Sequence, residues 1–367
     1  MRQRSFNFYK VISRDYKLSL GLMTFGLFVI VGIMANDLAH PESVFISFGP
    51  ETATQSSPIY KAPGYIEVMA DGNSRMHVLG TDQLGRDVLS RMIHGTRLTL
   101  IVGLVSTGIS FLIALLLGSL AGYFGDNKIQ VNFIDILIGI GGIIGGISFL
   151  AYNATNISEH GQSNFDVGKT LVIILFLLTL FFALRKVSTR LNLRKWLLPL
   201  DSIIVKLLEV FRAIPALFLI IALFSLIQHP SIWTVVFIIG VLRWGTMTRL
   251  LRAEIMQLKT ENYIISARLM GLSEWRILAY HIWPNAIGPM IVSACFYIGT
   301  AVLIEATLSF LGIGVPVNVV TWGNMLSTSR AYIGAWWLAL FPGLAIFLLI
   351  LSVTIIGDRL RKRLKKG

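Results

Sequence analysis

Long apolar stretches alternate with short polar segments along most of the chain. About 20 apolar residues cross a lipid bilayer as a helix, and these stretches are continuous rather than alternating like membrane β-strands. Eight largely uncharged stretches lie at 18–35, 98–124, 129–152, 170–184, 203–227, 232–248, 286–311 and 335–356. The pattern therefore predicts an all-α integral membrane protein with about eight spans.

The charges of the polar segments predict which side of the membrane each one occupies. Residues 1–17 and 358–367 are rich in lysine and arginine, whereas 153–168 holds acidic residues and no lysine or arginine. Since basic segments stay in the cytoplasm, both termini should be cytoplasmic. The predicted organisation is a cytoplasmic segment with the first span (1–38), an extracytoplasmic loop (39–97), the second span (98–128), a hairpin (129–199) and a core (200–367) with a charged loop at 254–285.

A charged segment of helical character, which we call the elbow, occupies residues 261–285 within that core. We predict a first short helix over 261–270 and a hinge at Gly271, because glycine can take the left-handed conformation that ends a helix. Ser273 is a candidate N-cap for a second helix, and Pro284 should limit its far end. From the residues alone, contact with a cytoplasmic partner and an ordinary connecting loop are equally open.

Composition supports the membrane interpretation. Hydrophobic residues make up 54% of the chain and charged residues 14%. The net charge of +13 is compatible with nucleic-acid binding, but the basic residues lie beside apolar stretches, so we expect a lipid bilayer as partner and no nucleic acid. The single cysteine, Cys295, excludes an intrachain disulfide.

The sequence lacks the motifs of several enzyme classes. It has no GxxxxGK[ST] phosphate loop, no His-Glu-x-x-His helix and no GxSxG elbow, and no two of its six histidines are spaced i, i+4. We therefore expect no catalytic residues, metal or cofactor, and no ATP hydrolysis by this chain itself. Transport is better supported than intramembrane catalysis.

Two charged residues within apolar stretches, Arg243 and Glu305, are candidates for a translocation path. Arg243 could instead extend its side chain to the cytoplasmic interface. An ion-gradient-driven secondary transporter would need intramembrane carboxylates, for which Asp135 and Glu305 are the candidates. A membrane scaffold without transport activity is a further alternative.

Four stretches, at 77–91, 261–285, 305–326 and 342–361, match motifs of one known family in order and spacing. The chain resembles the second permease subunit of bacterial dipeptide/oligopeptide ATP-binding-cassette importers. The matching residues of the family's N-terminal motif are Gly80, Thr81, Asp82, Gly85, Arg86 and Asp87. The elbow is similar to the family's EAA coupling loop.

The resemblance implies a type I permease fold with six core transmembrane helices in the bacterial inner membrane. It also implies a second permease, two separate ATPase subunits and an extracytoplasmic solute-binding protein as partners. The implied solutes are di- and oligopeptides, with nickel complexes and peptide antibiotics as alternatives. The residues implied in coupling to the ATPase are Glu261, Tyr263, Ala267, Arg268, Gly271, Ser273, His281 and Pro284.

Two features depart from the family pattern. The segment 129–199 has no counterpart in a six-span permease and is expected to be an inserted transmembrane hairpin outside the translocation core. Arg243 stands where the family commonly has an uncharged turn that contains proline.

Overall fold

The computed structural model describes residues 15–39, 59–68, 74–126, 130–132, 195–225, 227, 231–313 and 319–364. The chain divides into two compact units, which are described separately. The first comprises Met1–Ser119 and Val210–Gly367, and the second Leu120–Glu209.

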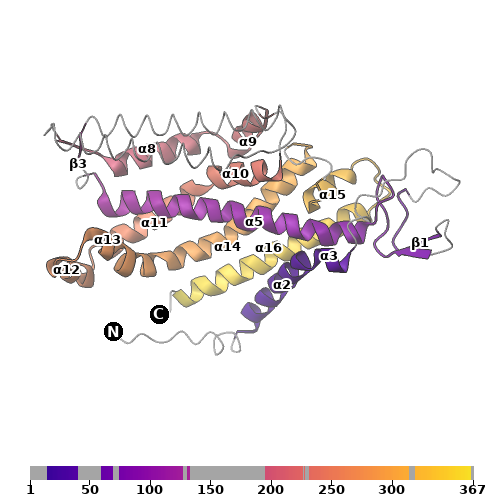
Figure 1. The fold of residues 1–367 in the computed structure, drawn as a ribbon, viewed down its shortest axis with the longest axis horizontal. Helices are drawn as coiled ribbons and strands as arrows, with labels where there is room; N and C mark the ends of the chain where they lie inside the picture. The colour runs from indigo at the N-terminus through magenta and orange to yellow at the C-terminus, as the bar shows by residue number, and fades with distance from the viewer. Residues whose placement is uncertain are drawn as a thin grey trace, which may run out of the picture. The chain divides into compact units, whose positions relative to one another are not determined.

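The first unit is a bundle of long helices (Figure 1). Its elements are α2 (Tyr16–Ile33), α3 (Ala35–Leu38), β1 (Tyr65–Val68), β2 (Ser74–His77), α5 (Val88–Ser119), α9 (Ala216–Ser225), α10 (Ile232–Leu242), α11 (Trp244–Leu258), α12 (Asn262–Leu269), α13 (Glu274–Ile277), the π-helix η3 (Leu278–Ile282), α14 (Trp283–Phe310), α15 (Trp322–Thr328) and α16 (Trp337–Leu364). Helix α5 packs against α2, α10, α11 and α14, and α14 also packs against α16 and α15. One core cluster joins α5, α14, α15 and α16, and another joins α9 and α10 to α5 and α14.

Five helices of the described residues are long and apolar enough to cross a membrane, or six if α8 (Leu200–Ala213) and α9 form one interrupted span. This agrees with a helical, multi-pass membrane protein. The predicted spans 129–152 and 170–184 lie outside the described residues, apart from 130–132, so the count of eight stays a prediction.

The observed elements do not coincide with the predicted apolar spans. Helix α5 begins at Val88, ten residues before the predicted second span, and the helix that leads into α14 begins at Glu274 rather than 286. The predicted third span would begin at Ile129, but β3 (Gln130–Asn132) is a strand. Periodicity did not reveal these limits because the helices continue beyond their apolar parts into polar sequence.

The elbow, the start of α2 and the end of α16 lie at the same end of the first unit. The carboxylate of Asp15, just before α2, forms ion pairs with Arg359 (3.5 Å) and Arg363 (4.0 Å) near the end of α16. Leu364 packs close to Gly288 near the start of α14. At the other end, Trp337 at the start of α16 contacts the N-terminal motif. The two chain ends of the described bundle and the elbow therefore share one end of the unit, and their cytoplasmic orientation stays a prediction.

The described part of the second unit contains η2 (Leu120–Phe124), β3, β4 (Lys195–Leu197) and most of α8. Strands β3 and β4 pair antiparallel, with Val131 opposite Trp196. The carboxylate of Asp126 accepts hydrogen bonds from the backbone N–H (3.0 Å) and the hydroxyl (2.7 Å) of Ser202. Strands β3 and β4 thus pair near the two limits of the predicted insert, and both the insert and its membrane hairpin stay predictions.

Candidate functional site

The hinge of the elbow is a left-handed glycine, as predicted. Gly271 has φ +77° and follows Met270, the C-cap of α12. Its N–H donates to the carbonyl of Arg268 (3.0 Å), and the N–H of Leu272 donates to that of Ala267 (3.3 Å). This is the Schellman pattern, which satisfies the last carbonyls of a helix while turning the chain. The hinge is therefore a defined turn with its backbone groups paired.

The second helix of the elbow starts at Glu274, with Ser273 in the extended N-cap conformation. The Ser273 side chain makes no capping hydrogen bond, so Ser273 is the predicted N-cap only by its backbone conformation. Arg268 and Glu274 form an ion pair across the hinge (3.6 Å), each 41% exposed. A pair this exposed stabilises the turn by less than about 1 kcal/mol.

The prediction that Pro284 ends the second helix was wrong. Pro284 lies in the first turn of α14, and helix continues from Glu274 to Phe310. The π-helical turn η3 immediately precedes it. A π turn shifts the hydrogen-bond pattern by one residue, so the helix can accommodate a proline, which has no N–H to donate. The elbow is thus joined to one long helix rather than separated from it.

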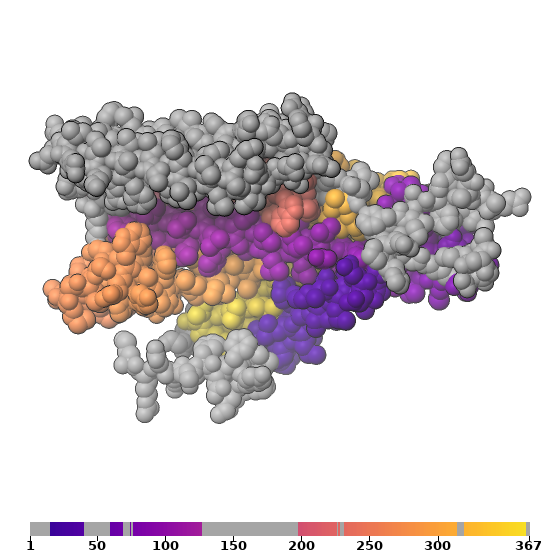
Figure 2. Space-filling model, viewed as in Figure 1, coloured from indigo at the N-terminus to yellow at the C-terminus, as the bar shows by residue number. Residues whose placement is uncertain are grey.

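The elbow has a buried inner face and an exposed end. Ile264, Ala267 and Ile277 are buried, so Ala267 supports the elbow from within and is not available to a partner. The elbow tip, by which we mean Leu269, Met270 and Trp275, is 83%, 74% and 62% exposed. The elbow projects from the end of the unit (Figure 2, orange). Sequence reasoning missed this tip; its signal was the presence of large apolar residues in an otherwise charged segment.

Of the remaining predicted coupling residues, some are exposed and others hold the elbow to the helical bundle. Asn285 donates to the Tyr263 hydroxyl (3.3 Å) and to the His281 carbonyl (2.8 Å), which ties α12 to the base of α14. Burial raises the pKa of Tyr263. Glu261 precedes α12 as an exposed N-cap, and Pro284 is exposed. Only some of the predicted residues can therefore meet a partner directly.

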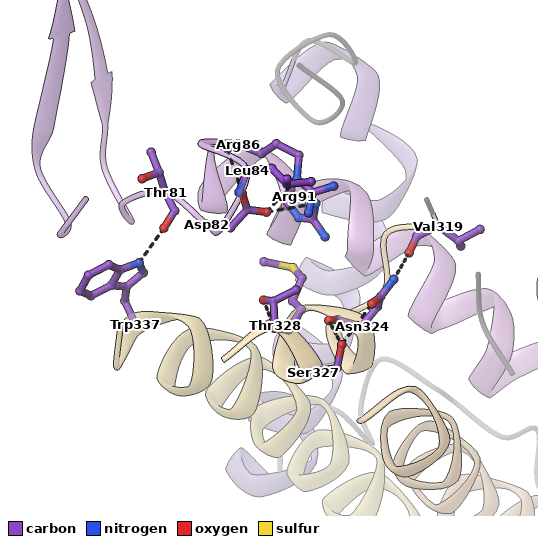
Figure 3. A network of polar contacts seen from close by, with 11 residues as sticks. Thr81, Asp82, Leu84, Arg86, Arg91, Val319, Asn324, Ser327, Thr328 and Trp337 are labelled. Atoms are coloured by element: carbon purple, nitrogen blue, oxygen red, sulfur yellow. Dashed lines mark hydrogen bonds and ion pairs between the residues drawn. The ribbon is translucent and has the colours of Figure 1, made fainter. Parts of the chain in front are cut away.

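At the opposite end of the unit, Asp82 organises the N-terminal motif. Its carboxylate accepts the backbone N–H groups of Leu84 (2.9 Å) and Arg86 (3.0 Å) and the Arg86 side-chain Nε–H (2.8 Å). Arg91 on α5 adds an ion pair (3.3 Å) (Figure 3). The segment 82–87 is a turn that precedes α5, because the Asp82 carboxylate binds its backbone N–H groups.

Asp87 caps α5 and binds a buried histidine. Its carboxylate accepts the N–H and the hydroxyl of Ser90, both at 2.7 Å, which satisfies a free N–H of the first helical turn. His77 lies between Asp87 (3.0 Å) and Glu67 (3.1 Å). The hydrogen bond to Asp87 raises the pKa of His77, although burial opposes this. For Asp87, burial acts to raise the pKa. The hydrogen bonds that its carboxylate accepts from His77 and Ser90 outweigh the effect of burial, so the pKa of Asp87 is lowered.

The other motif residues fasten this turn to the bundle. Gly80 has φ +80°, and a Cβ there would lie 2.5 Å from the carbonyl oxygen of Lys61, so the position requires glycine. The Thr81 hydroxyl accepts the Lys61 N–H (2.8 Å), and its carbonyl accepts the Trp337 indole N–H (3.1 Å) (Figure 3). Gly85 closes the turn by donating to the Asp82 carbonyl (3.1 Å). All six predicted motif residues therefore lie in one structural joint, by which we mean the turn at residues 80–87 that attaches the chain before α5 to the helical bundle.

Glu305 lies in the contact between α14 and α15 and not on a surface. It is fully buried, and its Oε1 accepts the hydroxyls of Ser309 (2.8 Å) and Thr321 (2.7 Å). Thr321 in turn caps α15 by accepting the Asn324 N–H. Glu305 thus positions α15; its predicted place in a translocation path has no support from this packing.

Comparison with known proteins identifies the family. Residues 191–366 match the family model "Binding-protein-dependent transport system inner membrane component". The Di/tripeptide transport system permease protein DppC of Pseudomonas aeruginosa is 30% identical over 295 residues, covering 80% of this chain and 73% of the relative. This chain belongs to the permease subunits of ATP-binding-cassette peptide importers. The Dipeptide transport system permease protein DppC of Alkalihalophilus pseudofirmus is 26% identical over 357 residues, covering 97% of this chain and 88% of the relative.

In this permease, Arg243 lies at the junction between α10 and α11. Its guanidinium stacks over the Tyr297 ring, 5.1 Å from the ring centre. It lines a narrow crevice with Ser106, Thr107 and Ser110 of α5. These residues are about 13 Å or more from either end of α5 at 1.5 Å per residue. Arg243 therefore lies beside the middle of α5, while its place in a translocation path and the alternative of extension to the interface both stay predictions.

Proposed function

We propose that this permease forms, with a second permease subunit, the translocation path of an importer for di- and oligopeptides. Relatives are named as permeases of di/tripeptide and D,D-dipeptide transport, the latter from Escherichia coli with 27% identity over 289 residues, 78% of this chain and 72% of the relative. ATP hydrolysis is then the task of two separate ATPase subunits.

The observation that carries the coupling role is the exposed apolar tip on a rigid elbow. Leu269, Met270 and Trp275 together present more apolar surface than a loop in water would need. Because all three are large and close to Gly271, they suit insertion into a cleft of an ATPase subunit. Anchors of this kind commonly contribute most of the binding energy of an interface.

The path of the transmitted movement would be α14. Its 28 residues extend about 42 Å at 1.5 Å per residue, from the elbow towards Glu305 and α15. A paired hinge followed by continuous helix passes a displacement on with little loss, whereas an unpaired loop would absorb it. ATP-driven movement of the ATPases would thus reach the far end of the bundle.

The proposed orientation places the elbow and both termini in the cytoplasm and the protein in the bacterial inner membrane. The basic residues in the last turn of α16, Arg361, Lys362 and Arg363, favour the cytoplasmic side. The joint of Asp82 and Asp87 would then face the extracytoplasmic solute-binding protein.

The test is a single charge at the elbow tip. Leu269→Asp should reduce co-purification of the ATPase subunits and peptide-stimulated ATPase activity by at least about tenfold, as for loss of an interface anchor. Ile333→Asp is the matched control, because Ile333 is 92% exposed and lies in the segment before α16, at the other end of the unit.

Two results would contradict the proposal. One is full ATPase association with Leu269→Asp. The other is peptide transport by the purified chain in liposomes driven by an ion gradient without any ATPase subunit, which would favour a secondary transporter.

A further inference from the structure

The crevice around Arg243 contains two polar atoms without partners. Arg243 Nε and Thr107 Oγ1 are both buried and make no hydrogen bond within the described part of the chain. Thr107 is 6% exposed and lines the same crevice as Arg243. Buried polar atoms are nearly always paired, so two unpaired ones at a single place indicate a group that is absent from the isolated chain.

The charge of Arg243 also lacks compensation. Among the described residues no carboxylate forms an ion pair with it, and its contact is with the face of Tyr297. Glu305 lies on the same helix as Tyr297 but about 12 Å further along it, where it is bonded to Ser309 and Thr321. A charge among the helices of a membrane protein is costly unless an anion or water meets it.

We propose that Arg243 and Thr107 bind a carboxylate of the transported solute, such as the C-terminal carboxylate of a peptide. A guanidinium offers several N–H donors in a plane that match the two oxygens of a carboxylate, and the Thr107 hydroxyl supplies one more donor. The inference rests on the proposed function in peptide import and adds a recognition site inside the permease.

The crevice is closed around Arg243 in this conformation, so solute would enter when the helices separate. The Ser110 hydroxyl donates to the Gly240 carbonyl (2.6 Å), which holds α10 against α5 beside the crevice. Arg243 also begins the segment that runs through α11 to the elbow. Movement of the elbow is therefore connected to the crevice through one helix.

The test compares a peptide that has a free C-terminal carboxylate with the same peptide as its C-terminal amide. Proteoliposomes contain this permease, the second permease and the ATPases, with the same binding protein added outside. Because that binding protein is common to all variants, its own preference cancels when the ratio of the two uptake rates is compared between variants.

Arg243→Gln should lower the free-to-amide uptake ratio by at least about tenfold, as expected for loss of a charge-assisted hydrogen bond in a poorly solvated site. Arg243→Lys should restore part of the ratio, since it keeps the charge. Arg330→Gln is the matched control and should leave the ratio unchanged, because Arg330 also stacks on an aromatic ring, Phe310 at 4.8 Å, but is exposed.

Equal loss of both peptides in Arg243→Gln, with co-purification of all subunits retained, would overturn the proposal and indicate a fixed carboxylate of another subunit as the partner of Arg243. An unchanged ratio would also overturn it. Absence of ATP-dependent uptake of either peptide by the wild-type assembly would instead contradict the proposed function on which the inference rests.

Discussion

Gly323 lies so close to Ala306 that a Cβ on Gly323 would come within 2.5 Å of the Ala306 Cα. This contact brings α15 against α14 beside the buried carboxylate of Glu305, which such a Cβ would approach to 3.1 Å. The distances leave no room for a methyl group unless the two helices move apart.

Gly323→Ala should therefore destabilise the protein by about 1–3 kcal/mol, the usual cost of overpacking. The measurement is thermal unfolding of the purified complex in detergent. Gly343→Ala is the control, because a Cβ there meets nothing within 4 Å and alanine favours the interior of α16. Equal stability of the two variants would contradict the tight α14–α15 contact.

Glu305→Gln should retain most of the wild-type uptake, because the amide oxygen can still accept the hydroxyls of Ser309 and Thr321. Glu305→Ala removes that acceptor and should lower the free energy of unfolding by about 1–3 kcal/mol. Uptake assays with and without a proton gradient test the packing role. A loss in Glu305→Gln confined to proton-dependent uptake would show that the carboxylate carries a proton instead.

Gly271→Trp should abolish ATP-coupled uptake while membrane insertion remains normal, because the large side chain would keep the elbow from binding in the cleft of the ATPase subunit. Gly312→Trp is a closely matched control. Gly312 has φ +78° against +77° for Gly271, and a Cβ meets nothing within 4 Å at either position. Backbone strain is thus the same in both variants, and wild-type uptake by Gly271→Trp would contradict the coupling role.

His77 should make the joint at the start of α5 sensitive to alkaline pH. The folded-state pKa of His77 is raised above its ordinary value of 6.5, so the stability it contributes is complete below that value and is lost as pH rises through the raised pKa. The pKa of Asp87 is lowered from 3.8, so its contribution is lost only as pH falls through that lowered pKa.

The measurement is the melting temperature of the wild type and of His77→Gln between pH 5.5 and 9. The wild type should lose more stability across this range than the variant, which has no proton to release at this position. Parallel pH profiles for the two proteins would show that the contacts of His77 with Asp87 and Glu67 do not depend on its charge.

The sequence by itself determined the features that depend on neighbouring residues. Apolar length alone indicated membrane helices, and a glycine between two helix-forming segments sufficed to predict the left-handed turn at Gly271. The family was recognisable because its motifs are short and continuous. These properties depend on backbone conformation and hydrophobicity over a few residues, which distant parts of the chain do not change.

Only the tertiary structure decided how residues far apart meet. The π turn before Pro284 keeps one helix running where local rules predict an end, and packing selects Ala267 for the interior and Leu269 for the surface. The role proposed for Arg243 depends on its contacts with Thr107 and Tyr297, which lie on two other helices. Burial and pairing of this kind arise between elements distant in the chain, so no local pattern could specify them.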